Sequence, residues 1–213
     1  ANVFGKYNSA FGSLALSNNT SNYNSAFGNA ALYKNVAGQQ NNAFGSSALY
    51  NNLTNYNNAF GTTALGFNTT GFRNSAFGHL ALASNTISSS NSAFGYRALT
   101  SNLASANSAF GSFALASNIT GFQNNAFGYK ALYKNTLGAR NNAFGVLALG
   151  LNTTGVRNSA FGNYALSNNT SGTSNNAFGH YANLLNTTGI RNSAFGTQAL
   201  RFNVTGSNNN AFG

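Results

Sequence analysis

The chain of 213 residues contains no Cys, Met, Trp, Pro, Asp or Glu. Without cysteine there is no disulfide, no thiolate metal ligand and no cysteine nucleophile. Without carboxylate side chains there is no Ser-His-Asp triad, no pair of acidic catalysts and no side-chain calcium site. We therefore expect that the protein is not an enzyme and that it uses no cofactor.

Charge is sparse and of one sign. Ten Lys and Arg residues give a formal net charge of +10, but no two of them are adjacent. Nucleic-acid-binding proteins usually concentrate their basic residues in a patch, and no apolar run approaches the roughly 18 residues that span a membrane. The sequence therefore predicts neither nucleic-acid binding nor membrane insertion.

The chain is one continuous repeat array over residues 1–213. The triplet AFG occurs thirteen times, at intervals of 16 or 17 residues. Its Phe residues are Phe11, Phe27, Phe44, Phe60, Phe77, Phe94, Phe110, Phe127, Phe144, Phe161, Phe178, Phe195 and Phe212. A period of this kind is typical of a solenoid, in which each repeat is one coil.

Positions within a coil are numbered here from this Phe, and residues at the same position in successive coils form a column. Position −3 is Asn in all thirteen repeats, and position +4 is Ala in all twelve complete ones. Position +5 is Leu in eleven of them, starting with Leu16, Leu32, Leu49 and Leu65, and Asn183 is the exception. Position +8 is Asn in all twelve.

The ends of the sequence carry the same repeat as its middle. Residues 2–8 match the loop at residues 68–74, so the first repeat begins within a loop. Solenoids need atypical polar repeats as caps at free ends. We therefore expect either a window of a longer array or end-to-end stacking on another copy.

Short repeats rich in Gly and Asn favour strand over helix. Each repeat offers two strand-like segments, N-x-A-F-G and x-A-L-x-x-N, followed by a loop whose third residue is Gly in eight of the nine five-residue loops. That Gly suggests positive φ, with Asn22 and Asn55 taking its place in shorter loops. The sequence predicts an all-β protein, a parallel β-solenoid flattened into a two-sheet roll of about 12 to 13 coils.

Stacked coils turn each column into a ladder, with Phe on Phe, Leu on Leu and Asn on Asn. Because neighbouring strand residues point to opposite faces, one residue of each Ala-Phe and Ala-Leu pair would lie outside as an apolar stripe. An exposed apolar stripe marks an interface, so we expect lateral self-association as a homotrimer. The alternative is a local bulge that places both residues of a pair inside.

The repeat resembles two groups of fibre proteins. Its NSAFG core is similar to the head repeats of trimeric autotransporter adhesins, which form left-handed parallel β-rolls wound into trimers. The segment NNAFGYKALYKNTLGARNNAFG at residues 124–145 resembles the NTAIGYQALYSNTTG-type arrays of tail-fibre and surface-fibre proteins of viruses and bacteria. The resemblance implies a left-handed coil, a trimer and a location outside the cell or on a cell or virion surface.

The Asn column at position +8 raises the question of N-glycosylation. It completes an N-x-[ST] sequon in eight repeats, at Asn19, Asn52, Asn68, Asn118, Asn152, Asn169, Asn186 and Asn203, and Asn18 and Asn168 add overlapping sequons. Asn persists in the four repeats without a sequon, which favours a structural role. Both readings remain open from the sequence.

Other columns suggest contacts with ligands. Arg73, Arg140, Arg157 and Arg191 share position −4 and would suit a polyanion, or form a solvated edge. Exposed Tyr residues at variable positions would suit cell-surface glycans, or reflect ordinary surface variation. His79 and His180 are too many coils apart to share a metal. Thr pairs such as Thr69 and Thr70 suggest ice binding, but adjacent residues cannot both face outward from one flat strand.

The sequence thus predicts a structural subunit of an extracellular fibre or spike, a rigid β-solenoid rod. The alternative is an adhesin or carbohydrate-binding fibre, and an ice-binding protein is a weaker third hypothesis.

Overall fold

The computed structural model describes residues 5–213. The chain forms two compact units that divide between residues 106 and 107, and each is described by itself. Both contain only strands, turns and bends within the described residues.

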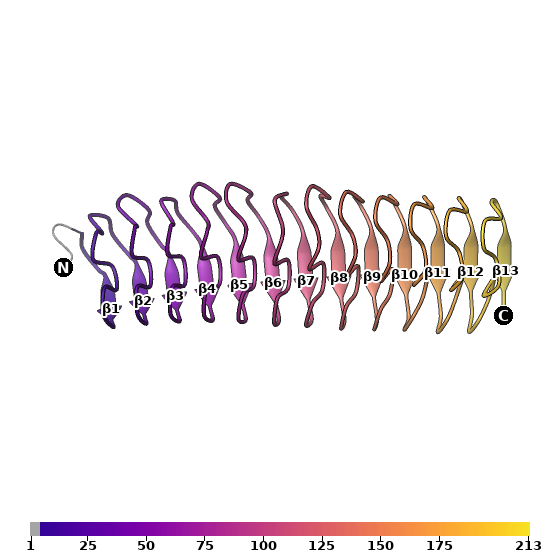
Figure 1. The fold of residues 1–213 in the computed structure, drawn as a ribbon, viewed down its shortest axis with the longest axis horizontal. Coiled ribbons are helices and arrows are strands. Elements are labelled where there is room, and N and C mark those ends of the chain that lie inside the picture. Colours follow the sequence, from indigo (N-terminus) through magenta and orange to yellow (C-terminus); the bar gives the residue numbers. More distant parts are fainter. Residues whose placement is uncertain (1–4) are drawn as a thin grey trace. The chain divides into compact units, whose positions relative to one another are not determined.

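Each repeat contributes one three-residue strand that ends at its Phe. The first unit holds β1 (Ser9–Phe11), β2 (Ser25–Phe27), β3 (Asn42–Phe44), β4 (Asn58–Phe60), β5 (Ser75–Phe77) and β6 (Ser92–Phe94). The second holds β7 (Ser108–Phe110), β8 (Asn125–Phe127), β9 (Asn142–Phe144), β10 (Ser159–Phe161), β11 (Asn176–Phe178), β12 (Ser193–Phe195) and β13 (Asn210–Phe212). Within each unit, consecutive strands pair in parallel with Phe opposite Phe (Figure 1). The prediction of an all-β parallel β-solenoid is confirmed.

The predicted second strand of each coil is wrong, and so is the two-sheet roll. The segment after the Phe is a series of turns, because the residues at positions +3 and +5 adopt left-handed backbone conformations, as in Ser47 (φ 56°) and Leu49 (φ 50°). Hydrogen bonds within the coil close these turns, such as the one from Asn52 N–H to Leu49 O at 3.1 Å. Other bonds join neighbouring coils, such as the one from Leu49 N–H to Ala64 O of the next coil at 3.0 Å. Sequence periodicity carried no sign of these left-handed residues, since none of them is Gly.

The interior of each coil is made by small and branched side chains. The strand Ala is fully buried in repeats such as those of Ala43 and Ala59, and the following Phe lies on the outside. In the Ala-Leu pair both residues are fully buried, as in Ala48 and Leu49. The outward stripe predicted for the Ala-Phe pair is therefore present, whereas the left-handed Leu turns its side chain inward beside Ala and removes the second stripe.

The Gly that follows each Phe is required by its backbone. Gly78 has φ 139°, and a Cβ there would overlap the backbone carbonyl of Gly95 in the next coil. Any side chain in this column would force neighbouring coils apart, since their backbones pass in direct contact. This column fixes the corner at which the chain leaves the strand.

Candidate functional site

The two Asn columns line the interior and hold the loop between them. Asn57, at position −3, accepts from Asn74 N–H at 3.0 Å and donates to Gly71 O at 2.9 Å. Asn68, at position +8, donates to Asn52 Oδ1 of the preceding coil and to Gly71 O, both at 2.8 Å. Both side chains are completely buried. The amides thus satisfy backbone groups that the irregular loop leaves without a ladder partner.

Of the two readings of position +8, the structural role fits this geometry and N-glycosylation does not. A glycan is attached through Nδ2, and in this column Nδ2 faces the coil interior. Buried members are Asn19, Asn52, Asn68, Asn118, Asn152, Asn169 and Asn186, and the half-buried Asn203 donates to Asn186 Oδ1 and Gly206 O. Of the overlapping sequons, Asn18 is exposed and Asn168 half-buried.

Gly occupies the third position of the loop for a different reason from the one predicted. Gly71 has no positive φ, but a Cβ there would overlap Ser88 O of the next coil and Asn68 Oδ1. Asn22 and Asn55 do not replace it, because in their loops Ser21 O and Thr54 O accept the Asn amides. Close approach, and not backbone conformation, selects Gly in this column.

The Phe column forms a continuous stack on the outer face of each unit. Ring centroids of Phe44, Phe60 and Phe77 follow one another at 4.6 and 4.5 Å with interplanar angles of 5° and 7°. In the second unit Phe127, Phe144 and Phe161 are each 4.7 Å apart. Stacking covers the ring faces and leaves the ring edges exposed. The result is a half-buried apolar stripe beside the strand Ser and Asn side chains.

The structure divides the four Arg residues of position −4 between the units. Arg140 and Arg157 lie on neighbouring coils and line one hollow of about 280 Å³ together with Phe122, Leu137 and Val156. The Arg140 guanidinium lies 5.4 Å from the Phe122 ring centroid. Arg73 belongs to the other unit, where it lines a separate hollow, and Arg191 lies two coils beyond Arg157. Only one pair of the four is therefore brought together.

The two His residues contact aromatic rings. His79 stacks on Tyr96 at 5.7 Å, and His180 lies 3.9 Å from Tyr181 between ring centroids. Residues 5–213 contain no cluster of three metal-ligating His, Cys, Asp or Glu side chains. The Thr residues at position +9 point their hydroxyls at the next coil, as Thr153 Oγ1 does toward Thr170 O at 3.0 Å, so they do not form a free hydroxyl rank.

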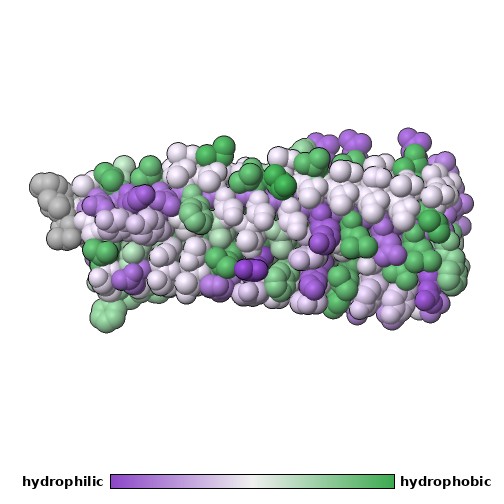
Figure 2. All heavy atoms as spheres, in the orientation of Figure 1, coloured by the Kyte–Doolittle hydropathy of each residue, from purple (hydrophilic) through white to green (hydrophobic). Residues whose placement is uncertain are grey.

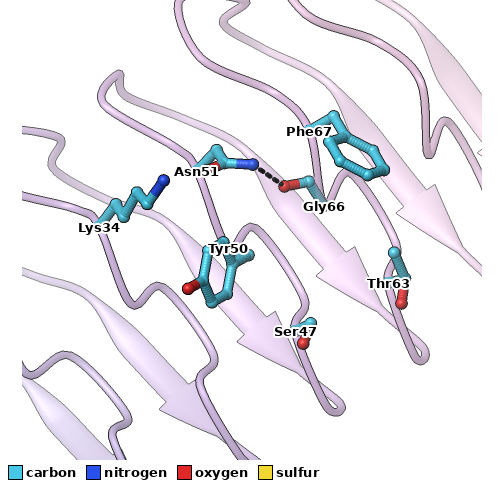
Figure 3. Close-up of a pocket in the computed structure, with 7 residues that line it drawn as sticks. All are labelled: Lys34, Ser47, Tyr50, Asn51, Thr63, Gly66 and Phe67. Atoms are coloured by element: carbon cyan, nitrogen blue, oxygen red, sulfur yellow. Dashed lines mark hydrogen bonds between the residues drawn. The ribbon is translucent and has the colours of Figure 1, made fainter.

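A hollow of the first unit opens above Gly66. It has a volume of about 400 Å³ and is lined by Lys34, Ser47, Tyr50, Asn51, Thr63, Gly66 and Phe67. These residues come from three successive coils, and Figure 3 shows the Tyr50 and Phe67 rings with Gly66 between them. Asn51 Nδ2 donates to Gly66 O at 3.0 Å and fixes the floor. We call this feature the Gly66 hollow.

Aromatic rings and a single cation define the chemistry of the Gly66 hollow. Tyr50 stacks on Tyr33 at 5.1 Å, and Lys34 Nζ lies 5.5 Å from the centroid of the same Tyr50 ring. Phe67 is 56% exposed. Apolar walls with few polar groups are typical of ligand sites. Figure 2 shows that apolar, near-neutral and hydrophilic side chains are interspersed on the visible face of each unit.

The sequence suggested exposed Tyr residues at variable positions, of which Tyr50 is one, but it did not reveal this hollow. The signal was present in the column at position +6, where Tyr33 and Tyr50 are followed by Gly66. Gly66 ends this pair of rings, and the small Ala83 follows at the same position of the next coil, so the stack has no third ring. Recognising the hollow also required knowing that Thr63 and Phe67 lie around Gly66, and the turns after the Phe that set this arrangement were not predicted.

Within residues 5–213 no helix is long and apolar enough to cross a membrane. Comparison of the chain with protein-family models, with curated proteins and with solved structures finds no match.

Proposed function

We propose that the chain is a structural subunit of an extracellular fibre or spike, a rod of stacked coils that extends and supports other parts of the assembly. The observation that carries this proposal is the uniformity of the coils. The same Asn, Ala and Leu residues recur in the coil interiors, with Asn183 as the exception in the Leu column, and the Asn hydrogen bonds run from coil to coil. Such ladders sum local interactions along an axis and need no globular core.

The Phe column supports lateral association of the rods into a homotrimer. Its rings are partly open to solvent, as in Phe27 at 38% and Phe178 at 37% exposure. Burying a long stack of ring edges against two other copies would remove apolar surface from water at about 25 cal/mol per Å². This arrangement is the one that the resemblance to adhesin heads and tail fibres also implies.

Labelling of the native source tests this role. An antibody raised against the purified chain should decorate filaments or spikes on the surface of cells or virions in immunogold electron microscopy. Diffuse labelling of the cytoplasm, or labelling of globular particles only, would contradict the proposal.

A second candidate function, an adhesin or carbohydrate-binding fibre, is favoured by one observation, the aromatic Gly66 hollow.

A further inference from the structure

The Gly66 hollow exists because a stack of rings stops there. In the column at position +6, the Tyr33 and Tyr50 rings stack at 5.1 Å with an interplanar angle of 25°. Gly66 follows on the next coil and has no side chain. Tyr33 covers the side of Tyr50 that faces its own coil, and the side toward Gly66 opens into the hollow that Lys34 also lines. The hollow is therefore the place that a third ring would occupy.

The lining selects a ring that is apolar on its face and polar at its rim. Tyr50 and Phe67 provide aromatic surfaces, while Ser47 and Thr63 place hydroxyls beside them (Figure 3). A pyranose sugar has this character, because its axial C–H bonds form an apolar face and its hydroxyls lie around the edge. Aromatic side chains bind such faces by apolar contact, and the hydroxyls of Ser and Thr both donate and accept at the rim.

The charge of the site points to an acidic sugar. The chain has no carboxylate side chain, so Lys34 has no acidic side chain of its own chain to pair with. Its ammonium lies over Tyr50 at the edge of the hollow, where a ring substituent stacked on Tyr50 would reach it. The unopposed charge of +10 also draws polyanions toward the surface.

We propose that the Gly66 hollow binds one hexuronic acid unit of an acidic polysaccharide. The sugar ring continues the Tyr33–Tyr50 stack, its hydroxyls meet Ser47 and Thr63, and its carboxylate pairs with Lys34. The inference does not depend on the fibre role, since calorimetry on the purified chain tests sugar binding and immunogold labelling of the native source tests the fibre.

A double variant fills the hollow with the residues that the preceding coil already carries. Thr63→Ser with Gly66→Tyr copies Ser47 and Tyr50. A Cβ at Gly66 would meet Thr63 Cγ2 at 2.8 Å, and the Ser substitution removes that methyl group. The variant should therefore fold with an unchanged circular dichroism spectrum. Ala116→Tyr adds a ring at the same position of a coil in the other unit and serves as the control.

The probe is a galacturonic acid hexamer, titrated into the full chain by calorimetry, with its neutral methyl ester as the comparison ligand. We expect the double variant to lose at least about tenfold in affinity, because the aromatic site is occupied, while Ala116→Tyr binds as the parent does. Undiminished binding by the folded double variant would overturn the site.

Lys34→Gln tests the charge, with Arg191→Gln as a control that removes a cation elsewhere. Lys34 is exposed, so its loss should weaken binding of the acid by roughly two- to fivefold and leave binding of the methyl ester unchanged. Equal affinity of the parent chain for acid and ester, or equal losses in both Gln variants, would overturn the assignment of an acidic sugar.

Discussion

At the scale of single residues, the buried Asn amides form the hydrogen bonds to loop backbone groups that neighbouring strands form in a regular sheet. Asn57 Nδ2 donates to Gly71 O and to Asn52 Oδ1, so its amide nitrogen faces two acceptor oxygens. The site needs a donor at this atom and tolerates no charge. Asn meets this requirement, and an ionised Asp does not.

Asn57→Asp should lower the free energy of unfolding at pH 7 by about 3–5 kcal/mol, because it buries an unpaired charge against carbonyl oxygens. Burial should raise the pKa of the new carboxyl in the folded state above its unfolded value. The destabilisation is then full above the folded-state pKa and shrinks as the pH falls toward the unfolded value. Urea titrations at pH 7 and pH 3 check this, and an equal loss at both would contradict it.

Asn183 is the one interruption of the Leu column, and neither its Nδ2 nor its Oδ1 has a hydrogen-bond partner. Asn183→Leu should raise the free energy of unfolding by about 1–3 kcal/mol, since it removes a buried unsatisfied amide. The same substitution at Asn186 should destabilise, because that amide donates to Asn169 Oδ1 and Gly189 O. Chemical denaturation of the two variants gives the comparison, and a less stable Asn183→Leu variant would contradict the account.

At the scale of the coil, the period, the parallel pairing and one outward residue in each Ala-Phe pair were predictable from residue spacing and strand alternation, but not that this residue is the Phe. The turns after the Phe were not, because Leu49 and Ser47 give no local sign of positive φ; the stacked neighbours impose it. The Asn column could be seen in the sequence, but sequons such as that of Asn68 suggested a surface role. Only the loop geometry around Gly71 shows that the amide points inward.

Whole coils should be removable. Deleting residues 142–158 joins Asn141 to Ser159 and restores the N-S-A-F motif in register. Since each coil contacts only its neighbours, the shortened chain should keep its circular dichroism spectrum and lose only a few degrees in Tm. Deleting residues 142–150 removes half a coil and should unfold the second unit. Comparable losses in both deletions would show that the coils are not independent modules.

At the scale of the whole molecule, the absence of Asp and Glu removes the usual cause of acid denaturation. Stability is lost in acid where native carboxylates with depressed pKa values must take up protons, and this chain has no such side chains. The urea midpoint should therefore be nearly the same at pH 4.5 and pH 2, a range in which only the terminal carboxyl titrates. A steep fall in the midpoint over this range would contradict the expectation.

The central claim is that coils stack along a fibre and that the Phe column joins three copies. Mass per unit length, measured by scanning transmission electron microscopy of the assembled fibre, tests both parts at once. With 22.1 kDa over 213 residues and coils about 4.8 Å apart, one chain contributes about 0.37 kDa per Å. We predict about 1.1 kDa per Å, the value for three chains on the same spacing. A value equal to that of a single chain would contradict the lateral trimer and leave the Phe column without its proposed role.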